Sequence, residues 1–247
     1  MTRLNLFHLF LLASSLSICS VSKAASAVQL KRLKVSAGQQ TSELALAHCN
    51  LKKGTQLEGV VVVLHGRGGH ESISDLAQKF ALFACQRGFA VAAPAAPTKN
   101  KNWPFEKLEG EKQDHFLLAL IKQILPQELR SKKKELKIYL VGISAGATFL
   151  MGDFYPRHGA QLKGFAAALC GGSQPTAARL SGLQSLEKSF PLFIQISSKD
   201  FLFQQAEQGL KKYADMGLPL RAKITDEPGH CAFDFVESLE NIEKLLR

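Results

Sequence analysis

The feature that most constrains the fold is a regular alternation of short apolar runs with longer amphipathic stretches. The run GVVVVLHG, residues 59–66, is continuous in β-branched residues, which is typical of a strand buried on both faces of a sheet. Comparable runs follow at 88–97, 136–142, 164–172 and 191–198. The stretches between them place apolar residues every three or four positions, which predicts helices. The alternation predicts one α/β domain with a mostly parallel sheet and helices on both faces.

The predicted helices and outer strands complete this arrangement. Helices are expected at 72–88, 111–129, 145–155, 201–217 and 232–247. Two further stretches alternate apolar and polar residues, as half-buried strands do. The first, 43–50, predicts an early antiparallel edge strand, and the second, 220–227, predicts a strand nearer the edge of the sheet.

The first residues of the chain have a different character. Arg3 precedes an apolar stretch from about residue 6 to 16, and Ala25-Ser26-Ala27 matches the small residues of a signal-peptidase site. The apolar stretch is too short to cross a bilayer. We therefore expect residues 1–27 to be a signal peptide and residues 28–247 to form the domain.

Two details leave the processing of this segment open. Ser22-Lys23-Ala24 is an alternative cleavage site, and Cys19 invites a lipoprotein interpretation, although Ile18 is bulkier than such sites favour. No other stretch is long and apolar enough to span a membrane. The mature protein is therefore expected to be secreted or periplasmic.

The chain is basic, with 31 lysines and arginines against 21 acidic residues. The basic residues cluster at 31–34, 99–101 and 130–137. Such clusters can attract anionic polymers, but they are also usual on solvated faces and at helix ends. Aromatic residues are not interleaved with them, so we expect no nucleic-acid partner.

A short motif interrupts the alternation at Gly142-Ile143-Ser144-Ala145-Gly146. It follows a predicted strand and precedes a predicted helix, so the chain must turn sharply there. Glycines two residues before and after the serine allow backbone to pass close to backbone. Such a turn lifts the Ser144 hydroxyl above the carboxyl edge of the sheet, at a helix N-terminus that favours developing negative charge.

A serine hydroxyl becomes a nucleophile when a base takes its proton and an acid orients that base. Asp200 directly follows the run 191–198, at the edge where a site belongs. His230 lies in the loop DEPGHCAF before the last predicted helix. The predicted triad is Ser144, Asp200 and His230, with Asp226 as an alternative acid. His115 and His158 are expected on the surface, and Asp234 is expected to be a surface or capping residue.

The oxyanion of acyl transfer needs two N–H donors. One is expected from the backbone of Ala145, and the other from the loop LHGRGG, residues 64–69. Within that loop Arg67 is the preferred donor and Gly66 the alternative. His65 is expected to brace the loop, and the Arg67 side chain either faces solvent or meets an anionic substrate.

From Glu58 to Arg247 the chain resembles the α/β-hydrolase superfamily, on the strength of LHGRGG, GISAG, Asp200 and the Gly-His pair before the last helix. The spacing is similar to that of small members with little or no lid, such as dienelactone hydrolases, carboxylesterases and polyhydroxybutyrate-depolymerase or feruloyl-esterase-like proteins. The resemblance implies hydrolysis of carboxylic esters through an acyl-serine, with neither a metal nor an organic cofactor. Many relatives have His-Gly ahead of the acid, where this chain has Ile196 and Ser197.

The chain has no insertion long enough for a large cap, so an open site bounded by short loops is expected. The loop 96–112 leaves a strand at the same edge and contains Trp103, the one tryptophan. On an open rim Trp103 would bind an acyl chain or an aromatic ester. The alternative is that Trp103 anchors its own loop to the body of the domain.

Four cysteines remain after the predicted leader: Cys49, Cys85, Cys170 and Cys231. An even number in an exported protein favours disulfides, and four cysteines allow three pairings. In the α/β-hydrolase fold the end of the strand 164–172 and the histidine loop both lie near the site. The resemblance therefore implies a Cys170–Cys231 bridge, with two buried free cysteines as the alternative.

These observations together predict an exported serine hydrolase that acts on a small-molecule or polymeric ester. Two rivals remain at this point. The first is a peptidase of the same fold, which would usually carry a propeller or cap over the site. The second is a catalytically inactive member that uses the cleft to bind a ligand.

Overall fold

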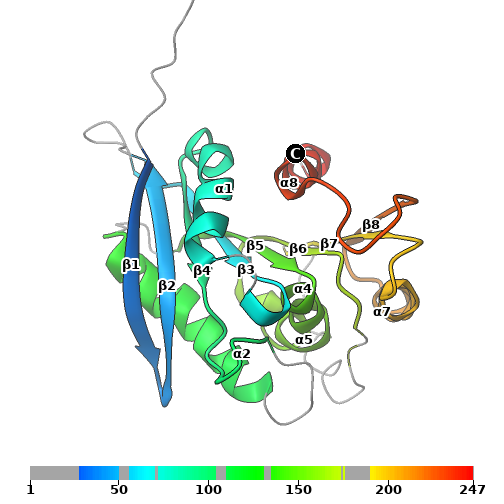
Figure 1. Ribbon diagram of the computed structural model, residues 1–247, viewed down its shortest axis with the longest axis horizontal. Helices are drawn as coiled ribbons and strands as arrows, with labels where there is room; N and C mark the ends of the chain where they lie inside the picture. Colours follow the sequence, from blue (N-terminus) through cyan, green and yellow to red (C-terminus); the bar gives the residue numbers. More distant parts are fainter. Residues whose placement is uncertain are drawn as a thin grey trace, which may run out of the picture.

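The computed structural model describes residues 28–49, 56–69, 72–103, 110–130, 135–173, 175 and 190–246. The predicted signal peptide, residues 1–27, lies outside the described residues and stays a prediction. Within the described ranges, eight strands form one sheet in the order β1-β2-β4-β3-β5-β6-β7-β8. Figure 1 shows this sheet running through the domain, with helices above and below it.

Strands β3 to β8 are all parallel, as the alternation predicts. Their bounds are β3 Gly59–Leu64, β4 Phe89–Pro94, β5 Lys137–Ile143, β6 Gly164–Leu169, β7 Leu192–Ser197 and β8 Leu220–Thr225. Every residue of β3, β4 and β7 is buried, because both faces of these strands are covered by helices. The strand β8 is the edge of the sheet and is largely exposed.

The prediction of an early edge strand was wrong in one respect. The strand β2 (Gln40–Cys49) is antiparallel as expected, but it lies inside the sheet between β4 and a further strand, β1 (Val28–Ala37). The two strands pair along their full length from Val28 opposite Cys49 to Ala37 opposite Gln40. The basic cluster 31–34 therefore belongs to the edge strand β1.

Helices form a layer on each face of the sheet, each over its own core cluster. One layer contains α1 (Ile73–Cys85) and α8 (Phe235–Leu246), which lie on the same side in Figure 1. The other contains α2 (Gly110–Ala119), which continues through the π-helical turn η2 (Leu120–Ile124) into α3 (Leu125–Glu128), and α7 (Phe203–Asp215). This layer also contains α4 (Ala145–Phe149), which continues through η3 (Leu150–Phe154) into α5 (Tyr155–His158) and the short 3-10 turn η4 (Gly159–Gln161). None of the described helices has both the length and the apolar character needed to cross a bilayer.

His158, expected on the surface, is buried at the end of α5. Its ring lies 5.1 Å from the ring of Phe154. Burial, followed by the nearby charges of His115, Arg157 and Lys122, lowers the pKa of His158 to about 4. The imidazole is therefore neutral at physiological pH and acts as part of the core.

Candidate active site

The turn at Ser144 has the sharp geometry that its motif predicts. The strand β5 ends at Ile143 and α4 begins at Ala145, so a single residue connects them. Ser144 has φ 50° and ψ −112°, a strained conformation for a residue with a side chain. Its N–H donates to the carbonyl of Leu169 at 2.9 Å, and its carbonyl accepts from the N–H of Thr148 at 2.9 Å. These bonds fix the strained residue between β6 and the new helix.

The two glycines of the motif are required by close backbone contacts. A Cβ placed on Gly142 would lie 2.7 Å from the Cα of Ala147. A Cβ placed on Gly146 would lie 2.4 Å from the carbonyl oxygen of Leu64, at the end of β3. Backbone atoms cannot move aside as a flexible side chain can, so any larger residue would displace the turn.

The three residues predicted as a triad form a hydrogen-bonded chain. The hydroxyl of Ser144 is 2.8 Å from Nε2 of His230. On the other side of the ring, Nδ1 of His230 is 2.7 Å from Oδ2 of Asp200. Because a carboxylate only accepts, Nδ1 carries the proton, which leaves Nε2 free to accept from the serine.

Asp200 occupies the turn directly after β7, and its carboxylate is fully buried. Its second oxygen, Oδ1, accepts from the N–H of Leu202 at 2.9 Å. A buried carboxylate destabilises the fold unless hydrogen-bond donors satisfy it, and here each oxygen has one N–H donor. Asp226, the alternative acid, is an exposed residue of the loop after β8. Asp234 accepts from the N–H of Glu237 at 2.8 Å and so caps α8, as expected.

The loop that carries His230 is held by a disulfide, which links Cys231 to Cys170 at the end of β6. Both cysteines have left-handed backbone conformations, with φ 49° at Cys170 and φ 58° at Cys231. Both sulfur atoms lie within 4.8 Å of a ring nitrogen of His230. Because the sulfurs are bonded to each other, they are not thiolate ligands for a metal.

A second tether of this loop comes from Ser197, one of the two residues that depart from the hydrolase pattern. Its buried hydroxyl donates to the carbonyl of Glu227 at 2.6 Å and accepts from the N–H of Lys199 at 3.1 Å. The hydroxyl thereby ties the end of β7 to the residues before His230. Sequence reasoning missed this role because it depends on a partner thirty positions along the chain.

The predicted oxyanion loop lies beside Ser144. A Cβ placed on Gly66 would lie 3.5 Å from the Cβ of Ser144. Arg67 follows in the 3-10 turn η1 (Arg67–Gly69) and is exposed, and Ala145 opens α4 on the other side of the serine. The N–H groups at the start of a helix have no intrahelical partner. The roles of Ala145 and Arg67 as donors stay predictions.

His65 braces this loop, as its sequence context predicts. The N–H of Ala96 donates to Nε2 of His65 at 3.0 Å, and Nδ1 is 2.7 Å from the carbonyl of Gly66. Burial is the main cause that lowers the pKa of His65, in spite of the bond to Gly66. A neutral ring with its proton on Nδ1 satisfies both contacts.

The expected role of Trp103 in substrate binding was wrong. Its side chain is fully buried, and its ring stacks on Phe149 of α4 at 5.2 Å and lies 5.8 Å from His65. The neighbouring Asn102 accepts from the N–H of Gly68 at 2.6 Å. Trp103 therefore anchors its loop beneath the oxyanion loop, because a large apolar ring gains more from this burial than from an open rim.

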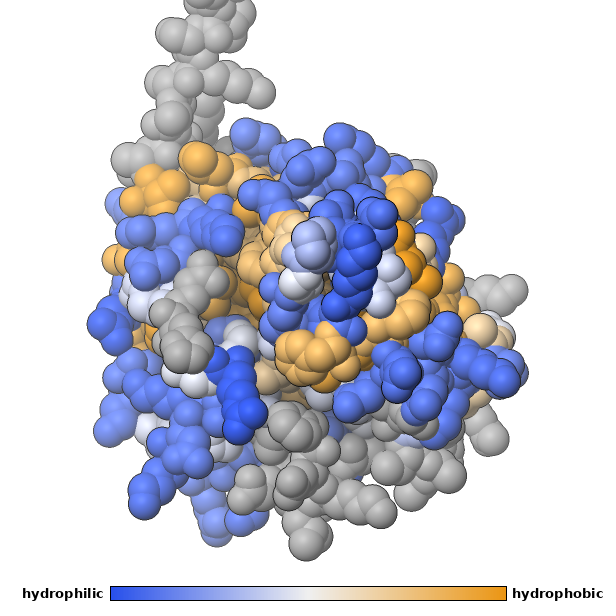
Figure 2. All heavy atoms as spheres, turned by 45° about the vertical axis from the view of Figure 1, so that its right-hand side comes forward, coloured by the Kyte–Doolittle hydropathy of each residue, from blue (hydrophilic) through white to orange (hydrophobic). Residues whose placement is uncertain are grey.

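A different aromatic residue lies at the site. Phe201 directly follows Asp200, is 75% exposed, and its ring centroid is 4.6 Å from that of His230. The only sequence signal for it is its place next to the predicted acid at the carboxyl edge of the sheet. Figure 2, which brings the β8 side forward, shows hydrophobic surface reaching solvent between hydrophilic side chains on this face.

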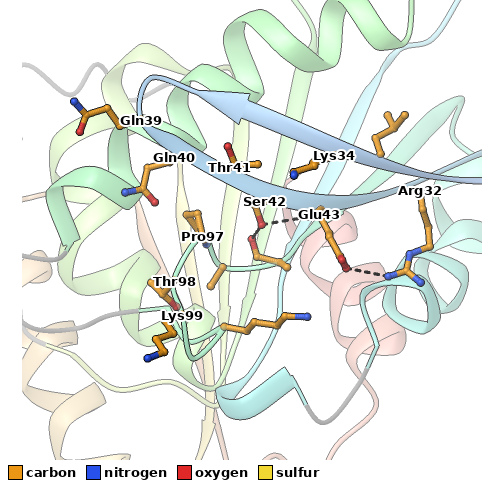
Figure 3. A pocket seen from close by; sticks show the side chains of 14 residues that line it. Arg32, Lys34, Gln39, Gln40, Thr41, Ser42, Glu43, Pro97, Thr98 and Lys99 are labelled. Carbon is orange, nitrogen blue, oxygen red and sulfur yellow. Dashed lines mark hydrogen bonds and ion pairs between the residues drawn. The ribbon is translucent and has the colours of Figure 1, made fainter.

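A groove of about 760 Å³ lies between the β1–β2 ribbon and the loop after β4, apart from Ser144, Asp200 and His230. Figure 3 shows Thr98 and Lys99 facing Gln40 and Thr41 across it. Arg32 on its wall is paired with Glu43 at 2.9 Å. The groove is lined mainly by polar and basic side chains, and no triad residue contributes to it.

No family model matches the sequence, and no curated protein matches it. Solved structures do match. One is a dienelactone hydrolase from Klebsiella pneumoniae, at a TM-score of 0.64 and 16% identity over 89% of this chain and 97% of that one. A ferulic acid esterase matches at a TM-score of 0.62 and 15% identity, over 88% of this chain and 96% of that one.

An acylaminoacyl peptidase from Pyrococcus horikoshii matches at a TM-score of 0.62 and 12% identity, over 83% of this chain. The present chain spans only 38% of that peptidase. The first two structures are matched over nearly their whole length. The chain has the α/β-hydrolase fold, in a single domain without a large cap among its described residues.

Proposed function

We propose that this protein is a serine hydrolase that cleaves carboxylic esters through an acyl-serine intermediate. The observation that carries the proposal is the hydrogen-bonded sequence from the Ser144 hydroxyl through His230 to the buried Asp200. Similarity in fold to a dienelactone hydrolase and a ferulic acid esterase supports a hydrolase that acts on esters.

The proposed reaction begins when the Ser144 proton moves to Nε2 of His230 and Oγ bonds to the carbonyl carbon. The carbonyl electron pair moves onto its oxygen, where the N–H groups of Ala145 and Arg67 would stabilise the negative charge. Collapse of this intermediate breaks the ester C–O bond, and the departing oxygen takes the proton from Nε2. Water then repeats the sequence, releasing the acid and restoring Ser144.

Asp200 supports both steps as a carboxylate, without taking up a proton itself. Its carboxylate holds the His230 ring in the tautomer that accepts from Ser144, and it stabilises the imidazolium that forms. The strained backbone at Ser144 keeps the hydroxyl at the open edge of the sheet, where a carbonyl carbon can approach.

Labelling and hydrolysis together test the proposal. A fluorophosphonate, which reacts with activated serines, is expected to modify Ser144 in the folded protein and to leave Ser144→Ala unlabelled. Hydrolysis of p-nitrophenyl acetate is expected to disappear in the same variant. Folded protein that neither reacts with the probe nor hydrolyses any of a panel of esters would support the ligand-binding alternative.

Asp200→Asn gives a matched test of the acid. Asparagine keeps an oxygen for the N–H of Leu202 but cannot hold the reactive tautomer, so kcat is expected to fall about 10³- to 10⁴-fold. Asp226→Asn, at the exposed alternative, is expected to leave kcat unchanged. The reverse result would assign the acid to Asp226.

We also propose that the protein is exported, on the basis of the predicted leader and of the two disulfides among the described cysteines. N-terminal sequencing of the mature protein is expected to begin at Val28, or at Ala25 for the alternative cleavage site. A mature protein that still begins at Met1 would contradict this.

A further inference from the structure

Phe201 has an unusual position for a large apolar side chain. It is 75% exposed, yet its ring rests on the ring of His230, with the centroids 4.6 Å apart and the planes tilted by 45°. The nearest comparison is Leu82 on α1, which is 62% exposed and far in sequence from any triad residue. Exposed apolar surface beside a reactive group often marks a binding site.

The chemistry of the proposed reaction indicates which part of the substrate would lie near Phe201. The imidazole of His230 must deliver its proton to the departing alcohol oxygen, so the alcohol group has to lie on the His230 side of Ser144. The oxyanion forms on the other side, near Gly66 and Ala145. Phe201 therefore lies next to the space that the alcohol group occupies, away from the expected oxyanion site.

The surroundings of the imidazole are also apolar. The Cys170–Cys231 sulfurs lie within 4.8 Å of one of its nitrogens, and the Phe201 ring covers another part of it. Aromatic rings and disulfide sulfurs offer contact area and no hydrogen bonds of consequence. Such a surface favours an aromatic or bulky apolar group over a small or charged one.

We propose that Phe201 forms a leaving-group subsite, which selects esters of aromatic or bulky apolar alcohols. The inference rests on the proposed ester hydrolysis and adds the class of alcohol to it. An aryl alcohol group would cover the exposed face of Phe201 while its oxygen receives the proton from His230. The acyl group does not reach this surface, so the subsite affects selection of the alcohol only.

Two series of esters separate the alcohol from the acyl group. The first keeps acetate and varies the alcohol through ethyl, phenyl and 2-naphthyl. The second keeps p-nitrophenol and varies the acyl group through acetyl, butyryl and hexanoyl. Values of kcat/KM are measured for the wild type, Phe201→Ala, Phe201→Tyr and the control Leu82→Ala, which removes an exposed apolar side chain elsewhere.

In the first series Phe201→Ala is expected to lower kcat/KM for 2-naphthyl acetate about tenfold and for ethyl acetate less than about twofold. In the second series the loss is expected to be the same for every acyl group, because p-nitrophenol is common to all. Phe201→Tyr is expected to retain the preference for aryl alcohols, and Leu82→Ala is expected to match the wild type.

Two results would overturn the inference while leaving ester hydrolysis intact. An equal loss for ethyl and 2-naphthyl acetate would mean that Phe201 only positions His230. No loss for either would mean that the ring contacts no substrate. A wild-type protein without any Ser144-dependent ester hydrolysis would instead contradict the proposed function itself, so the two failures can be told apart.

Discussion

The two halves of the candidate site are built in opposite ways. The serine turn is buried and crowded: Ala145 is 6% exposed, and backbone atoms lie where a Cβ of Gly142 or Gly146 would go. The histidine loop, residues 226–230, is exposed along its whole length. It is held by the Cys170–Cys231 disulfide, the Ser197 hydroxyl and the bond from His230 to Asp200.

The difference indicates whether a substitution in each half should change the stability of the fold, the rate of the reaction, or both. Packing defines the position of Ser144, so an error there should affect the stability of the whole sheet as well as the reaction. Three local links define the position of His230, so an error there should affect the reaction more than the sheet. The predictions below test this contrast, from the largest expected effect on hydrolysis to the smallest.

Gly146→Ala should disrupt the crowded half. The new Cβ would lie 2.4 Å from the Leu64 oxygen and 2.8 Å from the His65 oxygen, which belong to rigid backbone. We expect a loss of about 3 kcal/mol in the free energy of unfolding from overpacking. A displacement of Ser144 by about 1 Å would also lower kcat about 100-fold. Denaturant titration and p-nitrophenyl acetate hydrolysis measure the two effects.

Gly38→Ala is the matched control for that substitution. Gly38 has φ 58°, and nothing lies within 4 Å of an added Cβ. The substitution should therefore cost only about 1 kcal/mol, from backbone strain, and leave kcat unchanged. Equal losses from the two glycine substitutions would contradict the view that crowding at Gly146 defines the turn.

The two disulfides test the other half. Replacing Cys170 and Cys231 together by alanine should lower stability by about 4 kcal/mol in the chain-entropy model, and so should replacing Cys49 and Cys85. Only the first pair holds the histidine loop, so only its loss should also lower kcat, by about tenfold. Both kcat values are compared at a temperature where each variant remains folded.

The Cys49–Cys85 variant is the control, because this bridge joins the ends of β2 and α1. A similar fall in kcat in both variants would show that the disulfides act on the site only through general stability. An unchanged kcat without the Cys170–Cys231 bridge would show that Asp200 and Ser197 hold the loop by themselves.

The smallest expected effect on hydrolysis comes from the pH dependence of stability, through a histidine in the serine half of the site. His158 ends the helical segment that starts after Ser144, and its pKa is lowered from 6.5 to about 4. Its neutral form is favoured in the folded state, so the associated stability is complete above pH 6.5 and is lost as the pH falls towards 4. Denaturation midpoints at several pH values should show this loss in the wild type.

The variant His158→Gln cannot titrate and should lose less stability over the same pH interval. His48→Gln, in β2, provides a matched histidine substitution away from this segment. An acid loss of the same size in wild type and His158→Gln would place the titration elsewhere in the molecule.

The parallel sheet and the serine turn could be predicted from the sequence because both are local patterns. Continuous β-branched runs mark buried strands, and the glycines around Ser144 mark a close backbone approach wherever it occurs. Even the chain order of Asp200 and His230 follows from strand and loop signals nearby. The distances among the three side chains needed the folded structure.

Features that depend on distant partners could not be predicted. Trp103 and Phe201 both follow strands at the same edge, but Trp103 packs against Phe149 and His65 beneath it, while Phe201 lies exposed against His230. The hydroxyl of Ser197 has its role because Glu227 folds back over it. The edge strand β1 was missed because adjacent Lys31 and Arg32 break its alternation.

The outer strands β1 and β8 have a consequence for how copies of this protein meet. Within the part of the chain that the structure describes, each leaves one row of backbone N–H and C=O groups unpaired by the sheet, and such a row is a template for aggregation with another molecule. Exposed cationic side chains lie on both strands: Lys34 in β1, and Arg221 and Lys223 in β8. Lys31 and Arg32 of β1 are cationic too, but they are paired with Glu128 and Glu43. Because edges of like charge repel one another, the excess of basic residues helps to keep the sheets of separate molecules apart.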